Sequence, residues 1–148
     1  MLHLQHQAQP ALVGFADIRP PAIDDWQQYR LEGQQYLHVA QSAFLLEKKA
    51  FTTEILYNLI TMAIEKLVMA SLMEIGRLPY NHTMHDLVAA LEQWLPEVIK
   101  GLEEQVRNLD TYQDICDPYS CTIRIPTREE IETMLELARQ LKQRLASD

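Results

Sequence analysis

The chain has 148 residues, a length that fits one domain with a core large enough to fold without disulfides or structural metals. Hydrophobic residues make up 47% and only four residues are glycine, while Leu, Glu, Gln, Ala and Met are abundant, a composition typical of all-α proteins. The formal net charge of −8 opposes a general binder of nucleic-acid backbones, which needs a basic surface, so any nucleic-acid contact must be local.

The first 21 residues are expected to form a tail or an arm, because prolines recur in them and no hydrophobic period is sustained. Residues 22–148 are expected to form the single domain. The longest apolar stretch near the start, 11–13, is too short for a secretory signal, so we expect a cytoplasmic protein. Cys116 and Cys121 are then expected to be free thiols.

Two long helices are predicted in the first half of the domain. Asp24 can cap a first helix in which apolar and aromatic residues recur at threes and fours up to Lys48. Thr52 or Thr53 can cap a second helix that Gly76 ends. Apolar residues cover most of the circumference of this second helix, so it is either central to a bundle or also part of a dimer interface. Charged residues interrupt its apolar run, which favours a buried helix over a membrane span.

A third helix is predicted after a polar turn at 78–83. Its apolar stripe begins at Met84 and continues to Leu109. Pro96 lies inside this stretch and is expected to bend or restart the helix, which is then in two pieces.

The last quarter of the chain is predicted to hold a long loop and a closing helix. Residues 110–126 lack helical periodicity and are expected to be an ordered loop, long enough to be a site or a lid. Thr127 and Glu130 have the spacing of a capping box, and an amphipathic helix follows them. The predicted fold is therefore an all-α, antiparallel four- or five-helix up-and-down bundle.

Short sequence features follow one another along the predicted helices. They are Ala63, Glu65 and Lys66 in the second helix, His85, Asp86 and Leu87 after the turn, Leu109 and Asp110 before the loop, and Pro126, Thr127, Glu129 and Glu130 at the closing helix. This succession, over roughly Trp26 to Leu145, resembles the HEPN family of small helical domains, found in prokaryotic toxins and as partners of minimal nucleotidyltransferases. The resemblance implies an HEPN-like fold and a nucleotide or an RNA end as ligand.

The chain departs from the family pattern in two segments. Many members carry an Arg-Tyr-Pro-Asp type segment in the long loop, whereas here the nearest text is 117–120, which includes Tyr119, with Arg124 further on. The ribonuclease branch carries an Arg-x4-6-His motif on a helix. Arg77 and His82 have this spacing, but a neighbouring glycine and proline place them in a turn.

The predicted ligand site surrounds this turn. Glu65 and Lys66 are charged residues in an apolar helix, so one of them is expected to face a cleft in which basic side chains converge on a phosphate and a tyrosine stacks on a base. The alternative is that Glu65 pairs locally while Lys66 lies along the helix surface. The predicted ligand-binding residues are Lys66, Arg77, Tyr80, His82, His85, Asp86, Tyr119 and Arg124.

Arg77 and His82 are also candidate catalytic residues for metal-independent RNA cleavage. Such cleavage needs a base for the 2′-hydroxyl and a cation for the charge on phosphorus, which a His and an Arg can supply. Alternatively, Arg77 bonds the last carbonyls of a helix and His82 is simply exposed. His82 and His85 lie three apart beside Asp86, but no further His or Cys cluster is near in sequence, so we expect no metal and no cofactor.

Three functions follow from these patterns, and we favour the first. It is a non-catalytic, HEPN-like protein that binds a nucleotide or RNA end, forms a homodimer through helix 51–75 and, as the resemblance implies, works with a nucleotidyltransferase-type partner. The second is a toxin-type endoribonuclease that needs no metal. The third is an acidic protein–protein interaction module. None of the three involves a membrane.

Overall fold

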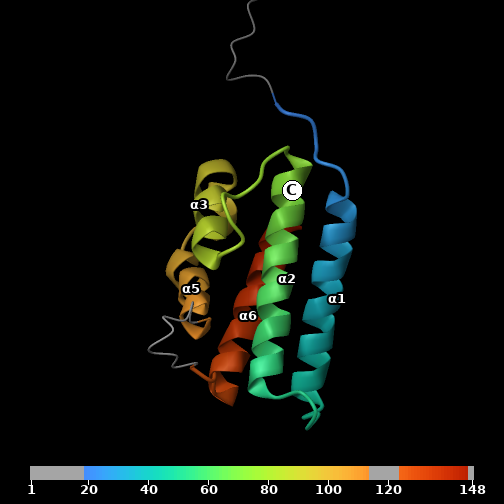
Figure 1. Ribbon diagram of the computed structural model, residues 1–148, viewed down its shortest axis with the longest axis vertical. Coiled ribbons are helices and arrows are strands. Elements are labelled where there is room, and N and C mark those ends of the chain that lie inside the picture. Colours follow the sequence, from blue (N-terminus) through green and yellow to red (C-terminus); the bar gives the residue numbers. More distant parts are fainter. Residues whose placement is uncertain (1–18, 114–123, 147–148) are drawn as a thin grey trace, which may run out of the picture.

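The computed structural model describes residues 19–113 and 124–146, and within them every regular element is helical (Figure 1). The elements are α1 (Trp26–Leu45), α2 (Thr53–Glu74), α3 (Met84–Trp94), α4 (Pro96–Ile99), α5 (Glu103–Asn108), the 3-10 helix η2 (Leu109–Tyr112) and α6 (Arg128–Leu145). The chain runs down α1, up α2, down through α3 to η2 and up α6. The predicted all-α helical bundle is confirmed. The segment predicted as its third helix is divided into the short elements α3, α4, α5 and η2.

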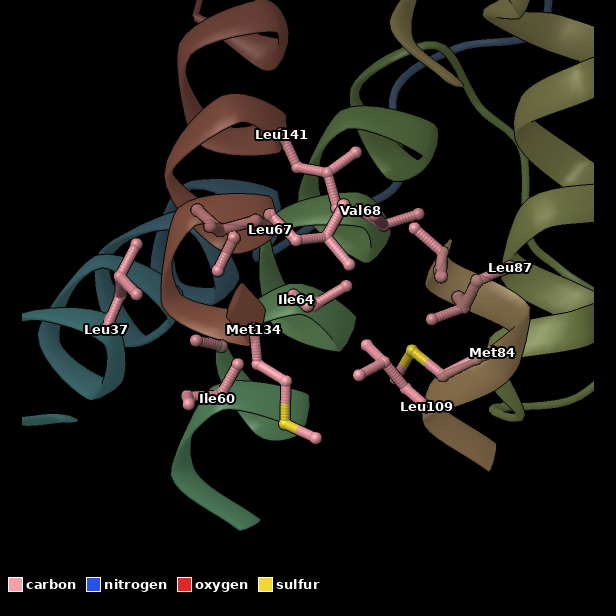
Figure 2. Close-up of a cluster of buried hydrophobic side chains, with 14 of the residues drawn as sticks. Leu37, Ile60, Ile64, Leu67, Val68, Met84, Leu87, Leu109, Met134 and Leu141 are labelled. Carbon is pink, nitrogen blue, oxygen red and sulfur yellow. The ribbon is translucent and has the colours of Figure 1, made fainter. Parts of the chain in front are cut away.

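Helix α2 lies at the centre of the bundle and packs against α1, α3 and α6. By length and composition it could cross a membrane, but 67% of its most apolar window is buried inside the protein. Figure 2 shows Ile60, Ile64 and Val68 of α2 among apolar side chains from the other elements. This central position explains why α2 is apolar around most of its circumference. Of its large apolar residues, Ile55 and Met62 stay exposed, at 42% and 40%.

Both ends of α2 follow the predicted capping chemistry. The Thr52 hydroxyl oxygen accepts a hydrogen bond from the Ile55 backbone N–H, at 3.3 Å. At the other end, Gly76 has φ of 73°, its N–H bonds the Met73 carbonyl, and the Arg77 N–H bonds the Leu72 carbonyl. This is a Schellman motif, and a Cβ at Gly76 would lie 2.5 Å from the Pro21 carbonyl oxygen.

The predicted capping box of the closing helix is also present. The Thr127 hydroxyl oxygen accepts from the Glu130 N–H at 3.1 Å, and the Glu130 carboxylate accepts from the Thr127 N–H at 3.2 Å. Helix α6 therefore begins where the sequence predicts. The long loop before it begins with η2, so 110–126 is not wholly irregular; residues 114–123, with Cys116, Tyr119 and Cys121, lie outside the described residues.

The ends of α1 differ from the prediction. Asp25 rather than Asp24 precedes the helix, and with φ of 72° its side chain makes no capping hydrogen bond. At the other end α1 stops at Leu45 rather than Lys48, because Glu47 adopts φ of 48° and turns the chain. The Lys48 N–H then bonds the Ala43 carbonyl, so the helix ends in a Schellman motif without a glycine.

The third helix has one more break than expected. As predicted, the helix breaks at Pro96, because proline has no N–H to continue the hydrogen bonds of α3, and α4 begins at this residue. A second break follows at Gly101, which has φ of 80° and separates α4 from α5. A single glycine in an apolar repeat is compatible with a continuous helix, so the pattern of the sequence does not mark this break.

Candidate functional site

The turn between α2 and α3 is held at the start of α3 by two side chains. The Thr83 hydroxyl oxygen accepts from the Asp86 backbone N–H at 3.1 Å, and the Thr83 hydroxyl donates to the Asp86 carboxylate at 3.0 Å. The Asp110 carboxylate, which comes from η2, accepts the backbone N–H groups of Met84 and His85, each at 3.0 Å. A negative charge at a helix start is favourable, so Asp110 ties η2 to the turn.

Each histidine of the turn is oriented by a carboxylate. His82 Nδ1 lies 2.6 Å from Glu65 Oε1, and His85 Nδ1 lies 2.7 Å from Asp110 Oδ2. An ionised carboxylate only accepts hydrogen bonds, so Nδ1 is the nitrogen that carries a proton in both rings. The imidazoles are 62% exposed, and Nε2 is the ring nitrogen left for an external partner.

Beside His82 lies a cavity of about 350 Å³, which we call the turn cavity. Its lining residues are Tyr57, Asn58, Thr61, Met62, Glu65, His82, Met84, Asp110 and Gln113. The Tyr57 hydroxyl donates to the Leu109 carbonyl at 2.6 Å. Burial, assisted by the negative charge of Asp110, raises the pKa of Tyr57 to about 12, so its hydroxyl stays neutral. The cavity is thus rich in carboxylate, amide and imidazole groups, and none of its described lining residues is Arg or Lys.

The adjacent Glu65 and Lys66 have different surroundings. Glu65 pairs with His82 and lines the turn cavity, so Glu65 is the member of this pair that faces a cleft. The Lys66 ammonium instead lies 2.8 Å from the Glu32 carboxylate and 4.1 Å from the centre of the Tyr29 ring, both on α1. The hydrogen bond between them lowers the pKa of Glu32 and raises that of Lys66. Lys66 therefore stabilises the contact of α1 with α2.

Arg77 follows the Schellman motif of α2 and reaches a different cavity. Its guanidinium lies 3.6 Å from the centre of the Trp94 ring at the end of α3, a cation–π contact. A cavity of about 450 Å³, which we call the arginine cavity, is lined by Arg19, Pro20, Glu74, Ile75, Arg77, Trp94 and Leu95. Glu74 is already paired with Arg30 at 2.6 Å. Within residues 19–113 and 124–146, neither Arg19 nor Arg77 has an ion-pair or hydrogen-bonding side-chain partner.

The remaining predicted site residues are dispersed. Tyr80 is 91% exposed in the turn, and the Asp86 carboxylate bonds the hydroxyl of Thr83. Arg124 pairs with Glu130 at 2.8 Å and lies 4.9 Å from the centre of the Tyr112 ring. Among the predicted residues that the structure describes, His82 reaches the turn cavity, His85 joins it through Asp110, and Arg77 reaches the arginine cavity.

The cavities also include residues that the sequence does not mark as site residues, among them Trp94, Asp110 and Arg19. Trp94 fits the apolar stripe of α3 and was assigned to the core, Asp110 was placed at the start of the loop, and Arg19 was placed in the tail. Each reaches its cavity through contacts between distant segments. No local pattern marks such contacts, so the spacing of residues in the sequence could not have identified them.

In the described part of the chain, no group of three or more His, Cys, Asp or Glu side chains is placed to hold a metal ion. No protein-family model, curated protein or solved structure matches the chain. The resemblance to HEPN domains therefore stays a prediction that rests on the residues, and the chemistry of the two cavities must carry any functional conclusion.

Proposed function

We propose that this protein is a non-catalytic, HEPN-like binding protein that holds the phosphate of a nucleotide or RNA end in the arginine cavity. The observation that carries the proposal is the position of Arg77, fixed against Trp94 without a carboxylate partner among the described residues. A guanidinium presents several N–H donors in a planar fork that matches a phosphate.

The charges that line the arginine cavity favour an anion. Arg19 and Arg77 contribute two positive charges, and the one carboxylate among the described lining residues, that of Glu74, is neutralised by Arg30. Tyr80 follows Arg77 by three residues and is almost fully exposed, so its ring is available to stack on a base. A local basic cavity of this kind allows an acidic protein to bind a phosphate.

The turn cavity is less suited to this ligand. A phosphate there would face the carboxylates of Glu65 and Asp110, without an Arg or Lys among the lining residues. The ribonuclease alternative requires His82 and Arg77 to act on the same phosphate. Because His82 lines the turn cavity and Arg77 the arginine cavity, the arrangement supports binding over cleavage.

Thermal melting with nucleoside mono- and triphosphates and short RNAs bearing terminal phosphates tests the proposal. A ligand that binds only the native protein, at a hundredfold excess over its Kd, stabilises it by about 2.7 kcal/mol. We expect the ligand-induced rise in melting temperature to disappear in Arg77→Ala. It should persist in the control variant Arg139→Ala, which also loses one arginine but at a site on α6 where Arg139 pairs with Glu136. A shift that Arg77→Ala retains but His82→Ala loses would move the site to the turn cavity; no shift with any ligand would refute the proposal.

We also propose a homodimer through α2 and, from the HEPN resemblance, a nucleotidyltransferase-type partner. Exposed Ile55 and Met62 on α2 support the dimer, although burial of most of the other apolar residues of this helix leaves less apolar surface than the sequence suggested. Light scattering at micromolar concentration should give twice the monomer mass, and Met62→Glu should lower it. A monomer mass for the unaltered chain would contradict the dimer.

A second candidate function is the protein–protein interaction module. Leu45 and Leu46, at the end of α1, are 77% and 68% exposed, which is unusual for two adjacent leucines. If this alternative holds, Leu45→Ser together with Leu46→Ser should abolish recruitment of the partner while leaving the response to nucleotides unchanged.

A further inference from the structure

Ser71, the fourth residue from the end of α2, has a hydroxyl that no group in the described protein satisfies. The residue is 5% exposed, and its Oγ is the buried side-chain polar atom in the described chain that has no hydrogen-bond partner. A serine inside a helix usually bonds the carbonyl four residues earlier or points to solvent, and this one does neither. A buried hydroxyl without a partner calls for an explanation, such as a ligand that it binds.

Ser71 is one of the residues that line a small cavity between α1, α2 and α6, which we call the serine cavity. Its volume is about 190 Å³, and its lining residues are Arg30, Gln34, Leu67, Ser71, Glu74, Lys142, Leu145 and Ala146. Drug-sized ligands occupy pockets of roughly 300–1,000 Å³, so this cavity suits a compact group rather than a whole nucleotide.

Several groups that line the serine cavity can donate hydrogen bonds. The Ser71 hydroxyl, the Gln34 side-chain amide and the Lys142 ammonium have no hydrogen-bond or ion-pair partner within the described residues. Arg30 and Glu74 form an ion pair at 2.6 Å, which leaves the charge of Lys142 uncompensated among the lining residues. A hydroxyl, an amide and an ammonium that line one cavity, with a net positive charge among its described lining residues, are suited to an oxyanion.

We propose that the serine cavity binds a phosphate group, with Ser71, Gln34 and Lys142 as its hydrogen-bond donors. The site is separate from the proposed nucleotide site, because Arg19 and Arg77 line only the arginine cavity. The two cavities share one residue, Glu74 at the end of α2, which is neutralised by Arg30 and so opposes an anion on neither side. The serine cavity therefore takes either free phosphate or a terminal phosphate of a ligand that continues into solvent.

Titration of the full chain with inorganic phosphate, followed by amide and side-chain NMR at constant ionic strength, tests this site. We expect saturable shifts at Ser71, Lys142 and the Gln34 side-chain amide. Lys142→Met, at an exposed position, and Ser71→Ala should each weaken binding about tenfold, since a hydrogen bond to a charged group contributes roughly that factor. Arg77→Ala should leave the affinity unchanged, which separates this site from the nucleotide proposal.

Two results would overturn the inference. One is the absence of a saturable shift at these three residues. The other is a shift that both Lys142→Met and Ser71→Ala retain in full, which would mean that phosphate binds elsewhere. Repeating the titration with a nucleoside monophosphate distinguishes the sources of the phosphate: a weaker response than to inorganic phosphate indicates a free anion, and a stronger one indicates a terminal phosphate of a larger ligand.

Discussion

Gly33 allows α1 to approach α2 closely, and we expect Gly33→Ala to destabilise the protein. A Cβ at this position would lie 2.8 Å from Leu67 Cγ and 3.1 Å from the Ala63 carbonyl oxygen. Ordinary van der Waals contact between such atoms begins at 3.4 Å. Leu67 is 4% exposed and Ala63 is fully buried, so neither can move out into solvent to make room.

Two opposing effects set the size of the change. Overpacking a closed interior costs about 1–3 kcal/mol, whereas replacing a helical glycine by alanine gains about 1 kcal/mol from helix propensity. The difference is a destabilisation of about 1 kcal/mol. In a domain of this length that lowers the melting temperature by about 2–4 °C.

Calorimetric melting of Gly33→Ala measures this difference, and a double-mutant cycle with Leu67→Ala isolates the clash. Leu67→Ala alone should cost about 2–5 kcal/mol, but it removes the Cγ that the new methyl group would meet. In that background Gly33→Ala should be neutral or stabilising. If Gly33→Ala raised the melting temperature of the unaltered protein by several degrees, the close contact between α1 and α2 would not be as described.

Three further changes have defined directions. Glu47→Gly should raise stability by up to about 1 kcal/mol in urea denaturation, since φ of 48° strains any residue with a Cβ, and no change would show that the strain is absent. Thr127→Ala removes the capping box of α6 and should lower the free energy of unfolding by about 1 kcal/mol. Thr133→Ala, which removes a threonine inside the same helix, is the control and should have a smaller effect. Burial raises the pKa of Tyr57 in the folded protein to about 12, against 10.0 for an unperturbed tyrosine. Tyr57 therefore contributes roughly 2–3 kcal/mol to the free energy of unfolding below pH 10, and this contribution is lost between pH 10 and 12. Tyr57→Phe should remove this part of the pH dependence of unfolding, and an unchanged alkaline slope would contradict the assignment.

The parts of the fold that could be predicted are those that local chemistry decides. Thr52, Gly76 and Thr127 each satisfy backbone groups within a few residues, so their roles can be inferred from a short stretch of sequence. The sequence does not indicate the left-handed conformation of Glu47 or the helix break at Gly101, because neither residue type marks its conformation locally. A glutamate is not the residue expected in that conformation, and a lone glycine is compatible with an uninterrupted helix.

The candidate site was less predictable, because the partners of its charged residues come from distant elements. The sequence indicates that Lys66 must be paired or reach solvent, but Glu32 is brought to Lys66, and Trp94 to Arg77, only by packing of α1 and α3 against α2. The expected convergence of Lys66 with Arg77 assumed one cleft near the turn. Neighbouring positions on a helix point about 100° apart, so Glu65 and Lys66 face different elements.

The net charge of the chain and its local charge lead to different expectations about ligands. At −8 the protein as a whole repels polyanions, which argues against a binder of nucleic-acid backbones. At physiological ionic strength, however, exposed charges are screened beyond about 8 Å, so a bound phosphate responds mainly to the groups that line its cavity. Among the described residues around the end of α2, those groups are Arg19, Arg77 and Lys142 with one carboxylate, that of Glu74, which is already paired. The acidic net charge of the chain then favours ligands small enough to place their charge at this end alone, which is why we propose a nucleotide or an RNA end rather than a duplex.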